Sequence, residues 1–345
     1  MNLVFTCRRL ILKIVLANGI RVFGPLLFLL FNYANVNAQS AAGITGKPDT
    51  SYSTYSAYIN TKQSYPGITI AEEFHSPLIK EVKDVVYCTA GDRELLLDVF
   101  YPADKNKSLG IAIMIIHGGG WRTGNRTQHY ALAQHLANLG YTCFTPEYRL
   151  STEALYPAAV YDLKAALRWI REHVKEYSLS ENRIVAAGFS AGGELAAFLG
   201  ATNNVKKLEG AGCNDNEPAR VNAIVDIDGT LSFIHPESGE GDDSKKTSAA
   251  TYWFGYSKKE NPELWTEASP LTHAGAGTPP TLFLNSAVER MHAGRSDYIK
   301  ILSKHNIYTE VKTFERSPHS FCLFHPWFEP TVKQIDEFLK KVFKK

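Results

Sequence analysis

The sequence IVAAGFSAGGELAAFL, residues 184–199, carries the pattern that decides the fold. Its first residues, Ile184 to Ala187, form a short apolar run, which is typical of a strand buried on both faces of a sheet. Helical spacing resumes at Gly193, so Gly188-Phe189-Ser190-Ala191-Gly192 forms the turn between a strand and a helix. The glycines permit a sharp turn that lifts the Ser190 hydroxyl above the sheet edge, which makes Ser190 a candidate nucleophile.

Strands and helices alternate on both sides of this turn. Strands are expected at residues 82–88, 94–101, 111–116, 141–145, 184–187, 223–227, 281–284 and 309–314, and helices at 127–139, 158–177, 193–199, 297–305 and 331–342. Strands that alternate with helices build βαβ units. The sequence therefore predicts an α/β fold, with a mostly parallel sheet covered by helices on both faces.

The chain divides into three predicted regions. Residues 1–38 combine basic residues without any acid, the apolar run Val22 to Phe31 and small side chains before Ala38, as a signal peptide does. We therefore expect export to the periplasm or beyond the cell and no stable membrane insertion after cleavage, with a retained membrane anchor as the alternative. Residues 39–76 are expected to form a polar tail or linker, and residues 77–345 the folded domain. Residues 203–275 break the alternation and are expected to form a cap above the sheet.

Composition excludes several classes of protein. The chain has 345 residues, of which 44% are apolar and 21% charged, and its formal net charge is +2. These values are typical of a globular protein and give no electrostatic reason to expect nucleic acid as a partner. None of the five cysteines stands at CxxC spacing, so a cysteine-based zinc site is not expected. Cys88 and Cys143 lie in apolar runs and are interpreted as buried thiols, without a disulfide between them.

A second glycine motif, His117-Gly118-Gly119-Gly120-Trp121, directly follows the apolar strand Ile111 to Ile116. Adjacent glycines let the backbone approach a ligand and direct N–H groups towards it. Together with the N–H of Ala191, the N–H groups of Gly119 and Gly120 are predicted to form an oxyanion hole. No Gly-Lys-Ser/Thr follows, so a nucleotide-binding loop is excluded, and His117 is interpreted as a support for the loop.

The base that activates Ser190 should lie late in the chain, because the expected order is serine, acid, histidine. His319 follows the last predicted strand by a few residues, which places it at the carboxyl edge of the sheet with Ser190. We therefore assign His319 as the base. The other candidates are His273, His292 and His325.

The acid is predicted from the strand that ends at Asn285. Glu289 follows this strand by four residues, and a glutamate can hold the imidazole tautomer as an aspartate does. Asp297 and Asp228 are the alternatives; Asp297 starts a predicted helix, where an acid is favoured by the helix dipole, and Asp228 ends the strand Ala223 to Ile227.

At this point the chain resembles a known family. The motifs HGGGW (117–121), PEYRL (146–150), YPAA (156–159), RWIR (168–171) and GFSAGG (188–193) occur in the same order in the hormone-sensitive-lipase-like and feruloyl/acetyl-esterase branch of the α/β-hydrolase fold. The resemblance implies an eight-stranded sheet, a serine esterase and no cofactor or metal. Relatives typically carry Gly-x-x-Asp-Pro after the strand that here precedes Ser286-Ala287-Val288-Glu289-Arg290, so the acid departs from the family pattern. The segment Arg290 to Arg295 is similar to one in exported polysaccharide-deacetylating relatives.

These patterns predict an exported serine carboxylic-ester hydrolase that removes acetyl groups from xylan, pectin or a similar plant-type polysaccharide. Feruloyl or other short-chain esters are the alternative substrates, and Trp121, Trp253, Trp265 and Trp327 offer faces for sugar rings or simply a core. A prolyl-oligopeptidase-type enzyme would need a large extra domain, and a haloalkane-type hydrolase would need Asp at position 190. A non-catalytic binding protein would be expected to lack Ser190 or His319. The acidic residues 237–243 lack the full spacing of a calcium loop and are interpreted as a solvated loop.

Overall fold

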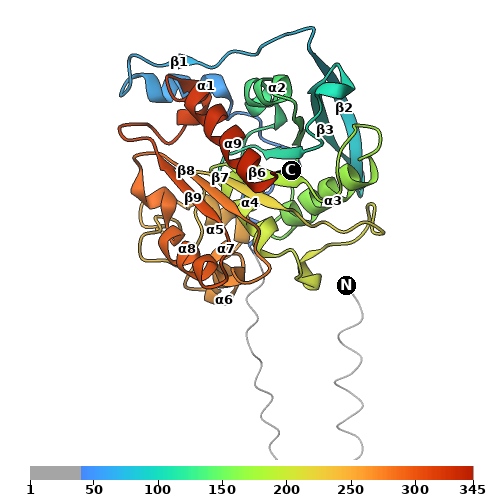
Figure 1. Ribbon diagram of the computed structural model, residues 1–345. Helices are drawn as coiled ribbons and strands as arrows, with labels where there is room; N and C mark the ends of the chain where they lie inside the picture. Colours follow the sequence, from blue (N-terminus) through green and yellow to red (C-terminus); the bar gives the residue numbers. More distant parts are fainter. Residues whose placement is uncertain (1–39, 345) are drawn as a thin grey trace, which may run out of the picture. The chain divides into compact units, whose positions relative to one another are not determined.

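The computed structural model describes residues 40–344, in which one sheet of eight strands forms the centre of the fold (Figure 1). The strands are β2 (Ile79–Ala90), β3 (Arg93–Pro102), β4 (Ala112–Ile116), β5 (Thr142–Pro146), β6 (Ile184–Phe189), β7 (Ala223–Ile227), β8 (Thr281–Asn285) and β9 (Thr309–Thr313). Their order across the sheet is β2-β3-β5-β4-β6-β7-β8-β9. Only the β2–β3 and β3–β5 pairs of this sheet are antiparallel. The prediction of a mostly parallel α/β sheet is confirmed.

Helices cover both faces of the sheet because the strand side chains alternate between two apolar cores. Along β4, Met114 points to the core that contains helices α3 (Ala158–Glu172) and α4 (Ala191–Ala201). Ile113 and Ile115 point to the opposite core, which contains α2 (Tyr130–Asn138) and α9 (Phe328–Val342). A smaller cluster packs α8 (Arg295–Lys304) against β7 and β8. This double coverage explains the continuous apolar runs that the strands show.

The segment expected to be a polar tail, residues 39–76, is instead folded onto the domain over its described part, so that prediction is wrong. Residues Thr54–Lys62 form helix α1, whose start is capped by Ser53. Ala57 and Ile68 are buried in the same core as α9. Strand β1 (Thr69–Ile70) pairs with β10 (Phe324–His325). The segment lacks apolar periodicity because only a few of its side chains enter the core, and these do so at irregular spacing.

The predicted cap, residues 203–275, is divided in two by β7, which lies inside the sheet between β6 and β8. The second part carries the short helices α5 (Ala249–Phe254), α6 (Pro262–Glu267) and α7 (Pro270–His273). Its aromatic residues form a core: Trp253 and Trp265 are fully buried, and Trp253 stacks on Trp121 with ring centroids 5.0 Å apart. Trp253 and Trp265 therefore do not offer faces to a sugar.

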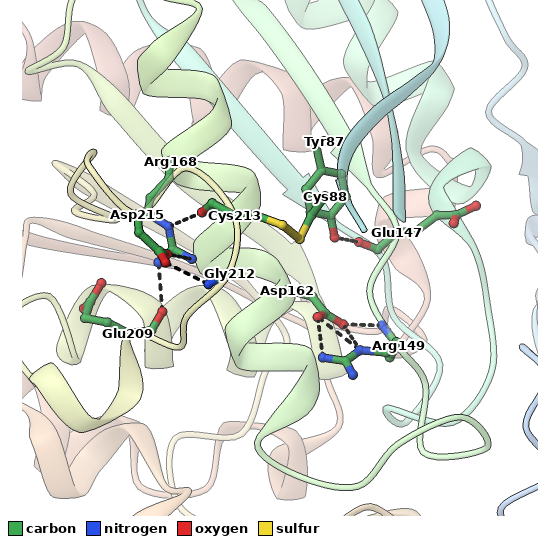
Figure 2. Close-up of a disulfide and its surroundings, with 10 residues drawn as sticks. All are labelled: Tyr87, Cys88, Glu147, Arg149, Asp162, Arg168, Glu209, Gly212, Cys213 and Asp215. Atoms are coloured by element: carbon green, nitrogen blue, oxygen red, sulfur yellow. Dashed lines mark hydrogen bonds and ion pairs between the residues drawn. A yellow bond between two sulfur atoms is a disulfide. The ribbon is translucent and has the colours of Figure 1, made fainter. Parts of the chain in front are cut away.

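A disulfide joins Cys88 of β2 to Cys213, across a sequence separation of 125 residues (Figure 2). Cys213 is held from the other side by the buried Arg168 of α3, whose Nε donates to the Cys213 carbonyl oxygen at 2.8 Å. The interpretation of Cys88 as a free thiol is therefore wrong. The pairing is not evident from the sequence, because Cys213 lies in an irregular segment that carries no strand pattern. Cys143 is a buried free thiol, as predicted.

The predicted signal peptide, residues 1–38, lies outside the described residues. From residue 40 to residue 344, no helix combines the length and the apolar character needed to cross a membrane.

Candidate active site

Ser190 lies at the turn between β6 and α4, in the strand–turn–helix arrangement that the sequence predicts. Its backbone has φ 57° and ψ −120°, a conformation rare for a residue with a side chain. The backbone N–H of Ser190 donates to the Ile227 carbonyl oxygen at 2.8 Å, which ties the turn to the neighbouring strand. A side chain at Gly192 would meet the Ile116 carbonyl oxygen at 2.1 Å, so the turn passes close to β4 only because this residue is glycine.

The imidazole of His319 lies beside Ser190. His319 is in the loop between β9 and α9, and its Nε2 is 2.8 Å from Ser190 Oγ. Its Nδ1 is 2.6 Å from Oδ2 of Asp228. A neutral imidazole with its proton on Nδ1 donates to Asp228 and accepts the hydrogen bond of the Ser190 hydroxyl. This arrangement orients the ring for proton transfer from serine.

The carboxylate that contacts His319 is that of Asp228, one of the two alternatives, so the prediction of Glu289 as the acid is wrong. Glu289 is exposed in the short 3₁₀ helix Glu289–His292. Asp297 is also exposed, and its carboxylate faces His235 at 3.5 Å. Because β7 is the immediate neighbour of β6, with Ile227 paired to Phe189, the residue after Ile227 lies beside the Ser190 turn.

Asp228 is fully buried, and its two carboxylate oxygens accept hydrogen bonds from several donors. Ser286 donates its backbone N–H to Oδ1 at 2.7 Å and its hydroxyl to Oδ2 at 2.5 Å. His292 Nε2 lies 3.0 Å from Oδ1. Burial opposes ionisation, but the hydrogen bonds from His292, His319 and Ser286 outweigh it and lower the pKa of Asp228 to about 2. The carboxylate is therefore ionised at neutral pH.

The glycine-rich loop after β4 lies next to the serine turn. One cavity is lined by Gly120, Trp121, Ser190 and Ala191. Gly119, the residue before Gly120, does not line it. Gly119 has φ +125°, and a side chain there would overlap the Thr123 carbonyl oxygen at 1.9 Å, so the loop requires glycine at this position. Gly120 of the loop and Ala191 at the start of α4 thus line the same cavity as Ser190, and the oxyanion hole stays a prediction.

Two buried side chains support this loop. The indole Nε1 of Trp121 donates to Oε2 of Glu194 in α4 at 2.9 Å, which joins the loop to the helix that follows Ser190. His117 stacks on Tyr148, with ring centroids 4.4 Å apart, and its Nδ1 lies 2.9 Å from the Gly118 carbonyl oxygen. Burial lowers the pKa of His117 to about 4, so this imidazole is neutral and structural.

The cavity beside Ser190 has a volume of about 50 Å³. Its remaining lining residues are Thr230, Gly239, Glu240, Arg290 and Met291, which come from the segments after β7 and β8. The acidic loop thus contributes Gly239 and Glu240 to the wall of the cavity. In the same loop, the Asp243 carboxylate accepts from Ser248 at the start of α5, at 2.6 Å. Between residues 40 and 344, no group of three or more histidine, cysteine, aspartate or glutamate side chains could hold a metal ion.

The other candidate histidines do not reach Ser190. Nε2 of His273 lies 2.6 Å from the Glu267 carbonyl oxygen, and Nδ1 of His325 lies 2.9 Å from the carboxylate of Glu329. His292 contacts Asp228, as described above.

In the sequence analysis, Asp228 is an alternative to Glu289 as the acid. His292 and Ser286 are not predicted there as hydrogen-bond partners of Asp228. The signal available for Asp228 was its position directly after an apolar strand.

The family follows from a comparison with known proteins. Residues 97–291, more than half of the chain, match the model of the BD-FAE family. The chain belongs to the BD-FAE family. The matched region includes Ser190 and Asp228 and ends before His319.

The chain is also similar to individual members of the wider α/β-hydrolase group. It is 28% identical over 241 residues to the probable carboxylic ester hydrolase LipM of Mycobacterium tuberculosis, covering 66% of this chain and 53% of LipM. It is 27% identical over 205 residues to esterase LipC of the same organism, covering 57% of this chain and 48% of LipC. The chain thus spans about half the length of these curated relatives.

Solved structures share the fold. A truncated carbohydrate esterase from gut microbiota aligns with a TM-score of 0.64 and 21% identity, over 78% of this chain and 100% of that one. Esterase 2 of Thermogutta terrifontis, with propionate bound, aligns with a TM-score of 0.62 and 26% identity, over 77% and 95% of the two chains. These alignments establish the α/β-hydrolase fold.

Proposed function

We propose that the protein is a serine carboxylic-ester hydrolase that removes acetyl groups from a plant-type polysaccharide such as xylan or pectin. The observation that carries this proposal is the chain of contacts from Ser190 Oγ to His319 Nε2, at 2.8 Å, and from His319 Nδ1 to Asp228 Oδ2, at 2.6 Å. A nucleophile, a base and an orienting carboxylate in this order are the machinery of acyl transfer.

In the proposed mechanism, His319 Nε2 takes the proton of Ser190 as Oγ attacks the ester carbonyl carbon. The oxyanion accepts hydrogen bonds from the backbone N–H groups of Gly119, Gly120 and Ala191, each worth about 3–4 kcal/mol of barrier. The C–O bond to the alcohol then breaks, and the alcohol leaves with the proton from His319. His319 then takes a proton from water as the water oxygen attacks the acyl carbon; the bond from this carbon to Ser190 Oγ breaks, and His319 returns the proton to Oγ, which releases the acid and free Ser190.

The size of the cavity supports a short acyl group. Pockets that hold drug-sized ligands measure roughly 300–1,000 Å³. The cavity next to Ser190 measures about 50 Å³, a size suited to an acetyl group. An aromatic feruloyl group would require this cavity to open, so feruloyl esters are the second candidate. The propionate bound to the Thermogutta terrifontis esterase is a comparably short acid.

The polysaccharide part of the proposal draws on the gut-microbial carbohydrate esterase that shares the fold. Export is proposed as well, to the periplasm or beyond the cell. It is supported by the Cys88–Cys213 disulfide, because disulfides persist mainly in oxidising compartments outside the cytosol.

The decisive experiment compares the mature protein with its Ser190→Ala variant on p-nitrophenyl acetate. The variant is expected to lose ester turnover and labelling by a fluorophosphonate probe, while its circular dichroism spectrum stays unchanged. Hydrolysis by Ser190→Ala at the wild-type rate, or a native protein that neither labels nor turns over, would refute the proposal. The second result would favour a non-catalytic binding protein.

The substrate is tested separately, by acetate release from acetylated xylan, pectin and mannan set against ferulate release from feruloylated oligosaccharides. The proposal expects acetate from xylan or pectin and little ferulate. Ferulate as the main product would instead establish the second candidate.

A further inference from the structure

Asp228 is shared by two imidazoles, of which the proposed mechanism uses only one. His319 Nδ1 lies 2.6 Å from Oδ2, and His292 Nε2 lies 3.0 Å from the other oxygen, Oδ1. The His292 side chain is only 11% exposed. An imidazole N–H that donates to a buried carboxylate makes a strong, directed contact, because the carboxylate is charged.

The position of His292 results from the loop after β8, in which Ser286 also faces Asp228. The Ser286 hydroxyl both donates to Asp228 Oδ2 and accepts the Val288 N–H at 3.0 Å, so the loop is folded around the carboxylate. His292 follows at the end of the 3₁₀ helix Glu289–His292. The loop after β8 is predicted to supply the acid. It supplies instead Ser286 and His292, which hold Asp228, the acid that follows the neighbouring strand β7.

We propose that His292 is a positioning residue for the esterase reaction, an inference that rests on the proposed function. It donates from Nε2 to Asp228 Oδ1 and so sets the rotation of the carboxylate. With the rotation set, Oδ2 faces His319 Nδ1 and holds the imidazole towards Ser190. His292 does not contact the ester itself.

The test is steady-state hydrolysis of p-nitrophenyl acetate by His292→Ala and His292→Gln. Loss of a hydrogen bond to a charged group is expected to lower kcat by about 10- to 100-fold, with KM within about twofold of wild type. Gln places an amide N–H near the position of Nε2, so His292→Gln is expected to recover most of the lost kcat. The matched control is His305→Ala, an exposed histidine after α8, which is expected to keep the wild-type kcat.

A double-substitution cycle separates positioning from a purely structural role. In an Asp228→Asn background, His292→Ala is expected to cause no further loss of kcat, because the carboxylate that it orients is gone. A wild-type kcat for folded His292→Ala, a failure of His292→Gln to recover kcat, or additive losses in the cycle would overturn the proposal. If His292→Ala does not fold, His292→Leu, which fills similar space without an N–H donor, takes its place in the kinetic comparison and in the cycle.

Failure of this inference is distinguishable from failure of the proposed function. An inactive Ser190→Ala variant beside a fully active His292→Ala variant would refute only the positioning role. An active Ser190→Ala variant would refute both.

Discussion

Asp228 Oδ2 lies 2.6 Å from His319 Nδ1, although the two residues are 91 positions apart and follow different strands. Asp228 follows β7, which lies next to β6 in the sheet, and His319 follows β9. The carboxyl ends of these parallel strands meet at one edge of the sheet, where Ser190 also lies. The site is therefore assembled from three separate loops at a single edge.

Asp228→Asn is expected to lower kcat for p-nitrophenyl acetate by about 10⁴-fold, because an amide no longer holds the reactive imidazole tautomer. Glu289→Gln is the matched control: its carboxylate is exposed and outside these contacts, so wild-type kcat is expected. A large loss of kcat in Glu289→Gln, together with wild-type kcat in Asp228→Asn, would show instead that Glu289 is the acid.

Glu194→Gln is expected to stabilise the protein increasingly as pH rises. Burial raises the pKa of Glu194 well above its usual value of 4.5, so the folded state keeps a proton that the unfolded chain loses above that pH. The contribution of Glu194 to wild-type stability therefore falls with rising pH, by up to about 1.4 kcal/mol per pH unit, until the folded-state pKa of Glu194 is reached. Glutamine has no proton to lose and matches the shape of the neutral acid.

Urea unfolding of wild type and Glu194→Gln at pH 5.5 and 7.5 measures this effect. The variant's advantage in free energy of unfolding should be larger at pH 7.5. A difference that does not change between the two pH values would mean that Glu194 is ionised in the folded protein.

Met291→Ala is expected to enlarge the cavity beside Ser190 and to admit longer acyl groups. Since one methylene group in an apolar pocket changes specificity by roughly 10-fold or more, the ratio of kcat/KM for butyrate over acetate esters should rise about 10-fold. Leu78→Ala removes an exposed apolar side chain that does not line the cavity, and should leave the ratio unchanged. An unchanged ratio in Met291→Ala would place the acyl group elsewhere.

The Cys88→Ser/Cys213→Ser double variant is expected to lose about 2–4 kcal/mol in free energy of unfolding, because the disulfide restricts the unfolded chain. None of the residues around the disulfide in Figure 2 contacts Ser190, His319 or Asp228, so the initial rate on p-nitrophenyl acetate at 25 °C should be retained.

Dithiothreitol provides the control for this prediction. It should lower the Tm of the wild type to that of the double variant and leave the variant unaffected. Equal Tm values for oxidised wild type and double variant would show that the disulfide does not stabilise the fold.

The sequence alone was sufficient for the α/β sheet, the Ser190 turn and the choice of His319 as the facing histidine. Each of these depends on a local pattern: an apolar run, glycines at a fixed spacing, or a residue's distance from the nearest strand. Local patterns determine which element a residue belongs to and at which end of it the residue lies. For a parallel sheet, this already places Ser190 and His319 at the same edge.

Only the tertiary structure decided the acid, the partner of Cys88 and the packing of residues 40–76. Asp228 and Glu289 both follow apolar strands, and the choice between them depends on which side chain the folded loops direct towards His319. Cys213 and Ala57 likewise lie in segments without periodic patterns, and their contacts join parts of the chain that are far apart. Such contacts form when elements pack, so their physical cause is the arrangement of the elements and is absent from any single stretch of sequence.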